Sequence, residues 1–152
     1  MMDGLNIPKL KKEVEIAFKD GGVIKISKMT LFLNHFSAHH TGEETVLEIL
    51  NRDVQFIPAL VENGGSNFAI LNIDSIFYVS EPGSEEKDPD KEDVLIQFIT
   101  GEQIEFTISE DLPGNRSRAI DFLNTDNVFL TFSKDGRKVY VNKNKINKVE
   151  VV

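Results

Sequence analysis

The stretch VEIAFKDGGVIKI at residues 14–26 decides how the chain is interpreted, because it returns as VLIQFITGEQIEF at residues 94–106. In both copies apolar residues alternate with others, give way to a segment with glycine, and then alternate again. Alternation with a period of two is typical of a half-buried strand, and glycine accepts the positive φ that a tight turn needs. The stretch therefore predicts one β-hairpin that occurs twice.

The correspondence continues to the end of each copy. Ile49-Leu50-Asn51 followed by Phe56 matches Phe122-Leu123-Asn124 followed by Phe129. The closing residues that match are Leu71-Asn72, Ile76 and Val79 with Val141-Asn142, Ile146 and Val149. Self-similarity of this kind predicts a tandem repeat. We expect an N-terminal leader at 1–13, repeat one at 14–80, an acidic flexible linker at 81–93, and repeat two at 94–152.

Each repeat is expected to hold five strands and one short helix. In repeat one the strands are predicted at 14–18, 24–26, 56–61, 68–71 and 76–79, and in repeat two at 94–98, 104–108, 128–132, 139–141 and 146–151. Val46, Ile49 and Leu50 form the apolar face of the first helix, and Thr41-Gly42-Glu43-Glu44 has the spacing of a capping box. Ala119, Phe122 and Leu123 form the same face in repeat two. The leader is expected to form a partial helical turn.

The predicted fold class is mainly β with one short helix per repeat. Units this small bury too little surface to be stable alone, so we expect two tandem small bent antiparallel sheets, or partly open barrels, packed on each other. Whether they form two barrels or one continuous sheet stays open.

Composition narrows the classes of function. The chain has no cysteine, which excludes disulfides and thiolate metal sites. The net charge is −8, and residues 81–93 hold seven acids and two lysines. An acidic chain repels a phosphate backbone, which makes nucleic acid an unlikely partner. We expect no membrane span and a cytoplasmic location, since no long apolar run is present.

All three histidines lie in the segment from residue 35 to residue 40. If this segment were helical, His35, His39 and Glu43 would share a face with a spacing that holds zinc or nickel. The alternative is an exposed loop, which we favour because Gly42 interrupts the projected helix. No cofactor is expected.

Two further groups are candidates for partner binding. Leu33 and Phe36 belong to an apolar run where repeat one is longer than repeat two, and the run either covers the core or binds a partner. The end of repeat two is basic because of lysines that include Lys138, Lys143 and Lys145, with Tyr140 nearby. This pattern fits a nucleic acid, an anionic lipid, or simply a solvated sheet face.

Asparagines recur at matched positions in the two repeats. Asn51 corresponds to Asn124, and Asn72 corresponds to Asn142. Their recurrence indicates a shared backbone role, such as a helix stop or a turn at the entry to a strand.

The repeat, with its glycine hairpin, its Ile/Phe-Leu-Asn helix end and its closing Asn-x-x-x-Ile-x-x-Val, resembles a family of small bacterial domains of unknown function. That resemblance covers both repeats and implies no catalytic residues. The closing strand alone is similar to that of Sm-like barrels, and Val141-Asn142-Lys143-Asn144-Lys145-Ile146 is similar to the last strand of LytTR-type DNA-binding domains. Neither of these two covers a whole repeat, and Asn72-Ile73-Asp74-Ser75 lacks the lysines.

The chain carries no nucleophile elbow, phosphate-binding glycine loop or zinc-protease motif, so we expect no enzyme. We expect a non-catalytic interaction or regulatory module with an unknown protein partner, and a homo-oligomer is open. One alternative is a small-ligand or nucleotide sensor with a pocket between the repeats. Another is nucleic-acid binding through the basic end of repeat two.

Overall fold

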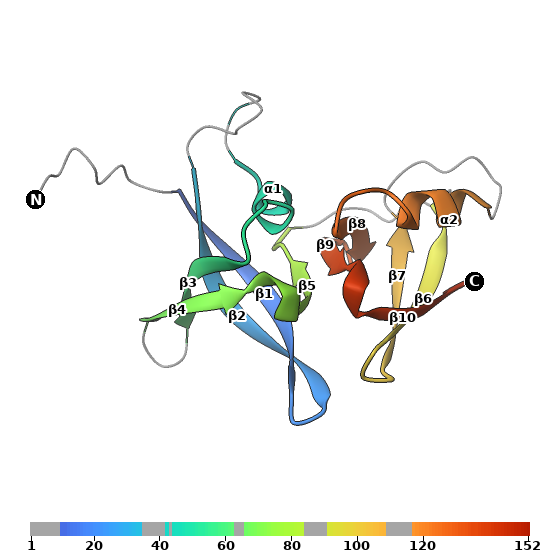
Figure 1. The fold of residues 1–152 in the computed structure, drawn as a ribbon, viewed down its shortest axis with the longest axis horizontal. Helices are drawn as coiled ribbons and strands as arrows, with labels where there is room; N and C mark the ends of the chain where they lie inside the picture. The colour runs from blue at the N-terminus through green and yellow to red at the C-terminus, as the bar shows by residue number, and fades with distance from the viewer. Residues whose placement is uncertain (1–9, 35–41, 43, 63–65, 84–90, 109–116) are drawn as a thin grey trace, which may run out of the picture.

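The computed structural model describes residues 10–34, 42, 44–62, 66–83, 91–108 and 117–152, and this part of the chain is mainly β (Figure 1). Its N-terminal half holds β1 (Leu10–Asp20), β2 (Val23–Leu33), α1 (Val46–Leu50), β3 (Phe56–Glu62), β4 (Ser66–Asn72), the 3-10 turn η2 (Ile73–Ser75) and β5 (Ile76–Ser80). Its C-terminal half holds β6 (Asp93–Phe98), β7 (Gln103–Ile108), α2 (Ser117–Leu123), β8 (Phe129–Lys134), β9 (Arg137–Asn142), η3 (Lys143–Lys145) and β10 (Ile146–Val151).

The ten strands form one continuous sheet in the order β10-β6-β7-β8-β9-β5-β1-β2-β3-β4, and every pairing is antiparallel. Each half has the same internal order: β5-β1-β2-β3-β4 in the first and β10-β6-β7-β8-β9 in the second. The halves are joined where β5 pairs with β9, with Val79 opposite Tyr140. This joint leaves β4 and β10 at the two ends of the sheet.

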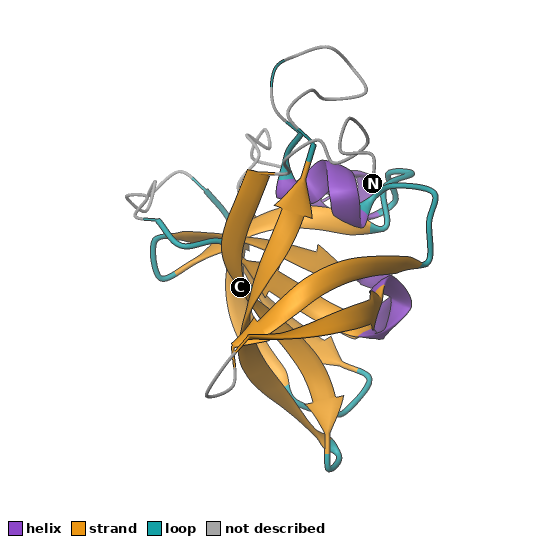
Figure 2. Cartoon of the chain, turned by 90° about the vertical axis from the view of Figure 1, so that its left-hand side faces the viewer, coloured by secondary structure: helices purple, strands orange, loops and turns teal. Residues whose placement is uncertain are grey.

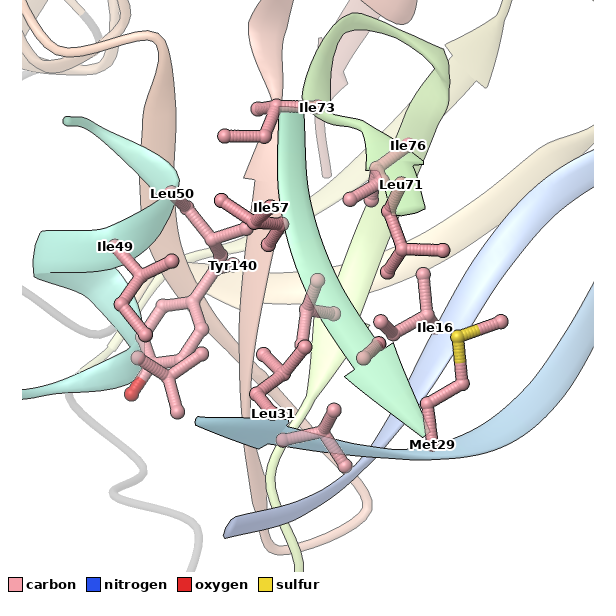
Figure 3. Close-up of a cluster of buried hydrophobic side chains, with 14 of the residues drawn as sticks. Ile16, Met29, Leu31, Ile49, Leu50, Ile57, Leu71, Ile73, Ile76 and Tyr140 are labelled. Atoms are coloured by element: carbon pink, nitrogen blue, oxygen red, sulfur yellow. The ribbon is translucent and has the colours of Figure 1, made fainter. Parts of the chain in front are cut away.

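The sheet twists strongly, and Figure 2, which looks onto the N-terminal half, shows its strands wrapping with a short helix over one end. Two apolar clusters lie against it. The N-terminal cluster, shown in Figure 3, includes Ile16, Leu31, Leu50 and Val79, and Ile49 and Leu50 come from α1. The C-terminal cluster is built largely from aromatic rings, namely Phe77, Tyr78, Phe98, Phe106, Phe122 and Phe132.

The two clusters exchange side chains between the halves. Phe129 and Tyr140, from β8 and β9, are buried in the N-terminal cluster. Ala17, Phe77 and Tyr78, from β1 and β5, are buried in the C-terminal cluster. Burial of apolar area therefore stabilises the joint as well as each half.

The N-terminal strands are longer than the sequence predicted. The described end of the expected leader, Leu10 to Glu13, belongs to β1 rather than to a helical turn, because Leu10 pairs with Leu33 across the hairpin. Leu33, from the apolar run where repeat one is longer than repeat two, also lies in a strand, β2. Charged residues in β1 and β2 made the alternation of apolar and polar residues hard to recognise in the sequence, although buried apolar residues continue along one side of each strand.

The predicted helix capping box was wrong by one turn. Thr45 is the N-cap residue of α1: its hydroxyl accepts from the Glu48 N–H, and the Glu48 carboxylate accepts from the Thr45 N–H. Glu44, which we expected inside the box, is instead buried, accepts from the Asn34 N–H at 2.9 Å and pairs with Arg52.

Candidate interaction surface

The hairpin of β3 and β4 lies at one end of the sheet and is apolar on both sides. Directly opposed residues of an antiparallel pair share a face. Leu71 and Ile57, which oppose each other, face the core. The other face carries what we call the β4 outer face, which consists of Phe56, Pro58, Leu60, Phe68 and Ile70.

Large side chains on this face are exposed to solvent. Phe56 is 55% exposed, Phe68 is 66% exposed and Ile70 is 67% exposed. The whole of β4 reads SNFAILN and carries no charge and no proline. Soluble proteins usually protect an edge strand with lysine, proline or a bulge, because its unpaired backbone groups template pairing with another strand. An uncharged apolar edge is therefore a candidate binding surface.

Two of the three corresponding positions of the C-terminal half are buried, whereas Lys138, which matches Phe68, is exposed. Phe129 matches Phe56 and is fully buried, and Tyr140 matches Ile70 and is 5% exposed. Both pack into the N-terminal cluster, so the outer face of β8 and β9 covers the core of the other half. The joint thus shows how a surface of this kind is covered when a partner strand is present.

Asparagine side chains fasten the joint. Asn51, which follows α1, donates from Nδ2 to the Phe129 carbonyl at 3.2 Å and accepts at Oδ1 from the Phe129 N–H at 2.8 Å. Asn142, which is fully buried, donates from Nδ2 to the Ile76 carbonyl at 2.9 Å. Asn51 and Asn142, two of the four asparagines to which we assigned a backbone role, therefore bond the backbone of the opposite half.

Charged and polar groups add contacts at the rim of the joint. Arg137 pairs with Glu15, and the Tyr140 hydroxyl donates to Glu81. The Glu102 carboxylate accepts from the Ile24 N–H at 2.7 Å. These bonds link residues from opposite halves and fix how the two are placed against each other.

Tyr78 lies at the centre of the joint, with its ring against Phe98 and Phe106. Burial raises the pKa of Tyr78 above its ordinary value of 10.0, and the negative charges of Glu102 and Glu15 add to the effect. The hydroxyl therefore stays neutral well into the alkaline range, which suits its apolar surroundings.

Two pockets include residues from both halves. One, of about 170 Å³, is lined mainly by charged side chains, Arg137 among them. The other, of about 300 Å³, follows the chain from Leu50 to Gln55 and reaches Val128. Small-molecule sites are mostly apolar clefts of roughly 300–1,000 Å³, and neither pocket has that character.

Of the residues proposed from the sequence as binding candidates, Leu33 is buried in the N-terminal cluster, as the core alternative requires. Lys138 is exposed on β9, whereas Lys143 donates to the Thr125 carbonyl and Lys145 lies over the Phe77 ring at 5.7 Å. The structure therefore does not bring the lysines and Tyr140 together as one exposed patch.

Phe36, His35, His39 and Glu43 lie outside the described residues. Within the described ranges, no group of three or more histidine, cysteine or acidic side chains is placed to hold a metal ion. Across the same part of the chain, no helix has the length and apolar character needed to cross a membrane.

Our reasoning from the sequence missed Phe56, Phe68 and Ile70 as surface residues. A signal was present in Phe68-Ala69-Ile70-Leu71, because four consecutive apolar residues in a short strand place apolar side chains on both faces. Such a strand needs cover on both sides, and the described residues of the chain cover only one of them.

No family model matches the chain, and comparisons with curated proteins and with solved structures also find no match.

Proposed function

We propose that this chain is a non-catalytic interaction module that binds a protein partner through the β4 outer face. The observation that carries the proposal is the exposure of Phe68 and Ile70 on the uncharged edge strand β4, beside the exposed Phe56 of β3. The counterparts of Phe56 and Ile70, which are Phe129 and Tyr140, are buried in the N-terminal cluster, so the same architecture provides a model of the bound state. Adding a strand to an exposed sheet edge is a common mode of recognition between proteins.

We also infer that the two halves derive from one duplicated unit. The identical order of strands in both halves supports this inference, and so does the matched use of Asn51 and Asn124 at the helix ends. In this view each unit ends in a β5-type strand on one side and a β4-type strand on the other. The joint pairs β5 with β9, which is the β4-type strand of the second unit.

The two alternatives have weaker support. A sensor would need a mostly apolar, ligand-sized cavity between the halves. The pocket that includes Arg137 is small and lined mainly by charges, and the pocket along Leu50 to Gln55 has about 300 Å³, the lower end of the usual range. Nucleic-acid binding would need free lysines at the end of the chain, but Lys143 and Lys145 contact other groups in the protein.

Photo-crosslinking in the producing cells tests the proposed interface. A photoreactive phenylalanine analogue replaces Phe68 on the β4 outer face, and a matched control replaces Ile26, which is 56% exposed on β2. We expect discrete crosslinked protein adducts from position 68 and none from position 26. Equal labelling from the two positions, or no protein adduct from position 68, would refute the proposed interface.

A further inference from the structure

We propose that the partner of the β4 outer face is a second copy of this chain, and that β4 of one copy pairs with β10 of the next. This inference rests on the proposed function and names its partner. It predicts a head-to-tail contact that repeats, between molecules, the β5·β9 joint found within the molecule.

The strands at the two ends of the sheet, β4 and β10, correspond to the two strands of the joint, β9 and β5. β9 corresponds to β4 through Asn142 and Asn72, and β10 corresponds to β5 through Val149 and Val79. The molecule therefore already contains one contact between a β4-type edge and a β5-type edge. Among the described strands it also has one edge of each type without a neighbouring strand, with β4 on the left of Figure 1 and β10 leading to the C-terminus on the right.

The register of the joint fixes the register of the new contact. In the joint, Tyr78, Val79 and Ser80 lie opposite Val141, Tyr140 and Val139. The same register between copies places Leu71, Ile70 and Ala69 of one chain opposite Lys148, Val149 and Glu150 of the next.

Backbone direction supports the same pairing. The Glu81 N–H donates to the Lys138 carbonyl across the joint at 3.0 Å. Because backbone groups alternate in direction along a strand, Val79 and Tyr140 also turn their backbone groups toward each other. By correspondence, the N–H and C=O groups of Val149 and Ile70 point outward from their edges, where none of the ten described strands covers them.

The side chains at the two ends are also complementary. Ile49, Leu50, Ile76 and Val79 receive Phe129 and Tyr140 and are all buried. Their counterparts next to β10 include Leu123, Ile146 and Val149, which are only partly buried. The end with β10 is thus a partly open apolar site, and Phe56 and Ile70 are the apolar side chains that match it.

Charge does not oppose the contact despite the net charge of −8. β4 has no charged residue, and on β10 the ammonium of Lys148 pairs with Glu150 at 2.9 Å. The polar contact between Tyr140 and Glu81 in the joint corresponds to Ile70 and Val151 between copies, which is an apolar pair.

A contact between two different edges is heterologous, so each copy that joins leaves one edge of each type free. The copies form a closed ring if the rotation between them closes, and an open filament if it does not. Both products contain the same β4·β10 contact.

Native mass spectrometry of edge-blocked variants tests the inference. Ile70→Pro removes the outward N–H of β4, and Val149→Pro removes that of β10, while proline on the outward side of an edge strand leaves the internal pairing intact. Each variant alone keeps one working edge and should be monomeric. Mixed in equal amounts, they should form a dimer of one chain of each kind and no larger species, whereas the unchanged chain forms larger assemblies.

The control is Ile26→Lys, which should assemble like the unchanged chain. A proline at this position would not be a suitable control, because Ile26 lies inside the sheet and pairs with Ala17.

The inference is overturned if the unchanged chain is monomeric at every concentration, if the mixed variants stay monomeric, or if either variant forms dimers alone. If Val149→Pro does not melt cooperatively, Val149→Lys replaces it in the same mixture and must give the same mixed dimer. If the mixture stays monomeric while position 68 crosslinks to a different protein, the inference fails and the proposed function stands. If position 68 forms no adduct either, both fail.

Discussion

At the scale of the residue, Asn51 shows how one side chain links local and long-range structure. It follows α1, and its amide bonds both backbone groups of Phe129 in the other half. The recurrence of asparagine in the sequence predicted a backbone role. The identity of the bonded residue could not be predicted, because Phe129 is distant in the chain and only the joint brings it near.

The substitution Asn51→Ala should lower the free energy of unfolding by about 1–3 kcal/mol, because it leaves a buried donor and acceptor without their partner. Urea denaturation measures the change. Asn124→Ala is the matched control: Asn124 is exposed, so its loss should cost the isolated chain far less. Equal destabilisation by the two substitutions would contradict the role of Asn51.

Tyr78 makes the free energy of unfolding depend on pH in the alkaline range. Its pKa is raised in the folded chain by burial and then by Glu102 and Glu15, so above a pH of about 10 the unfolded chain ionises first. The contribution of Tyr78 to stability is fully present below that pH and is lost as the pH rises toward the folded pKa. The variant Tyr78→Phe should show a shallower loss of stability over this range in urea titrations. A slope identical to that of the unchanged chain would exclude the effect.

At the scale of the element, most strands follow from alternation in the sequence. The predicted strands at 56–61 and 146–151 fall within β3 (Phe56–Glu62) and on β10 (Ile146–Val151). The lengths of β1 and β2 could not be predicted, because they depend on pairing along the full hairpin from Leu10 to Leu33. The helix cap was misplaced because two threonines, Thr41 and Thr45, each have a glutamate three residues later.

The capping box of α1 gives a prediction at this scale. Thr45→Ala removes the hydroxyl that accepts from the Glu48 N–H, and it should lower the free energy of unfolding by about 0.5–2 kcal/mol. Thermal unfolding followed by circular dichroism measures the change, and Thr45→Ser, which keeps the hydroxyl, should restore most of the loss. Equal losses in the alanine and serine variants would show that the hydroxyl bond is not the cause.

At the scale of the whole molecule, the decisive feature is the β5·β9 pairing, and no local pattern predicts it. Tyr140 was proposed from the sequence as a partner-binding residue, and the structure places it at a contact between the two halves. The candidate surface lies instead at the corresponding position of the other half, Ile70. The sequence shows that the two halves correspond. It does not show which edge strands pair with each other within the chain and which stay at the ends of the sheet.

Asn124 allows the stability of the chain and its assembly to be tested separately. If copies associate as proposed, Asn124 bonds the backbone of Phe56 in the next copy, as Asn51 bonds Phe129 within the chain. Asn124→Ala should therefore weaken assembly with little effect on unfolding of the isolated chain. Sedimentation velocity over a dilution series measures the assembly, and the control Asp126→Ala, also exposed near the end of α2, should leave it unchanged. If Asn124→Ala assembled like the unchanged chain, the proposed bond between Asn124 and Phe56 of the next copy would be refuted.

Hydrogen–deuterium exchange at the Ile70 amide is the most direct test of the central claim, compared between the unchanged chain and the Val149→Pro variant. The two residues lie on opposite end strands of the sheet, so a substitution at Val149 that leaves the melting temperature unchanged reaches Ile70 only through another copy. The account predicts that the Ile70 amide is protected in the unchanged chain and exchanges much faster in the variant. Equal exchange rates at Ile70 in the two proteins would contradict it.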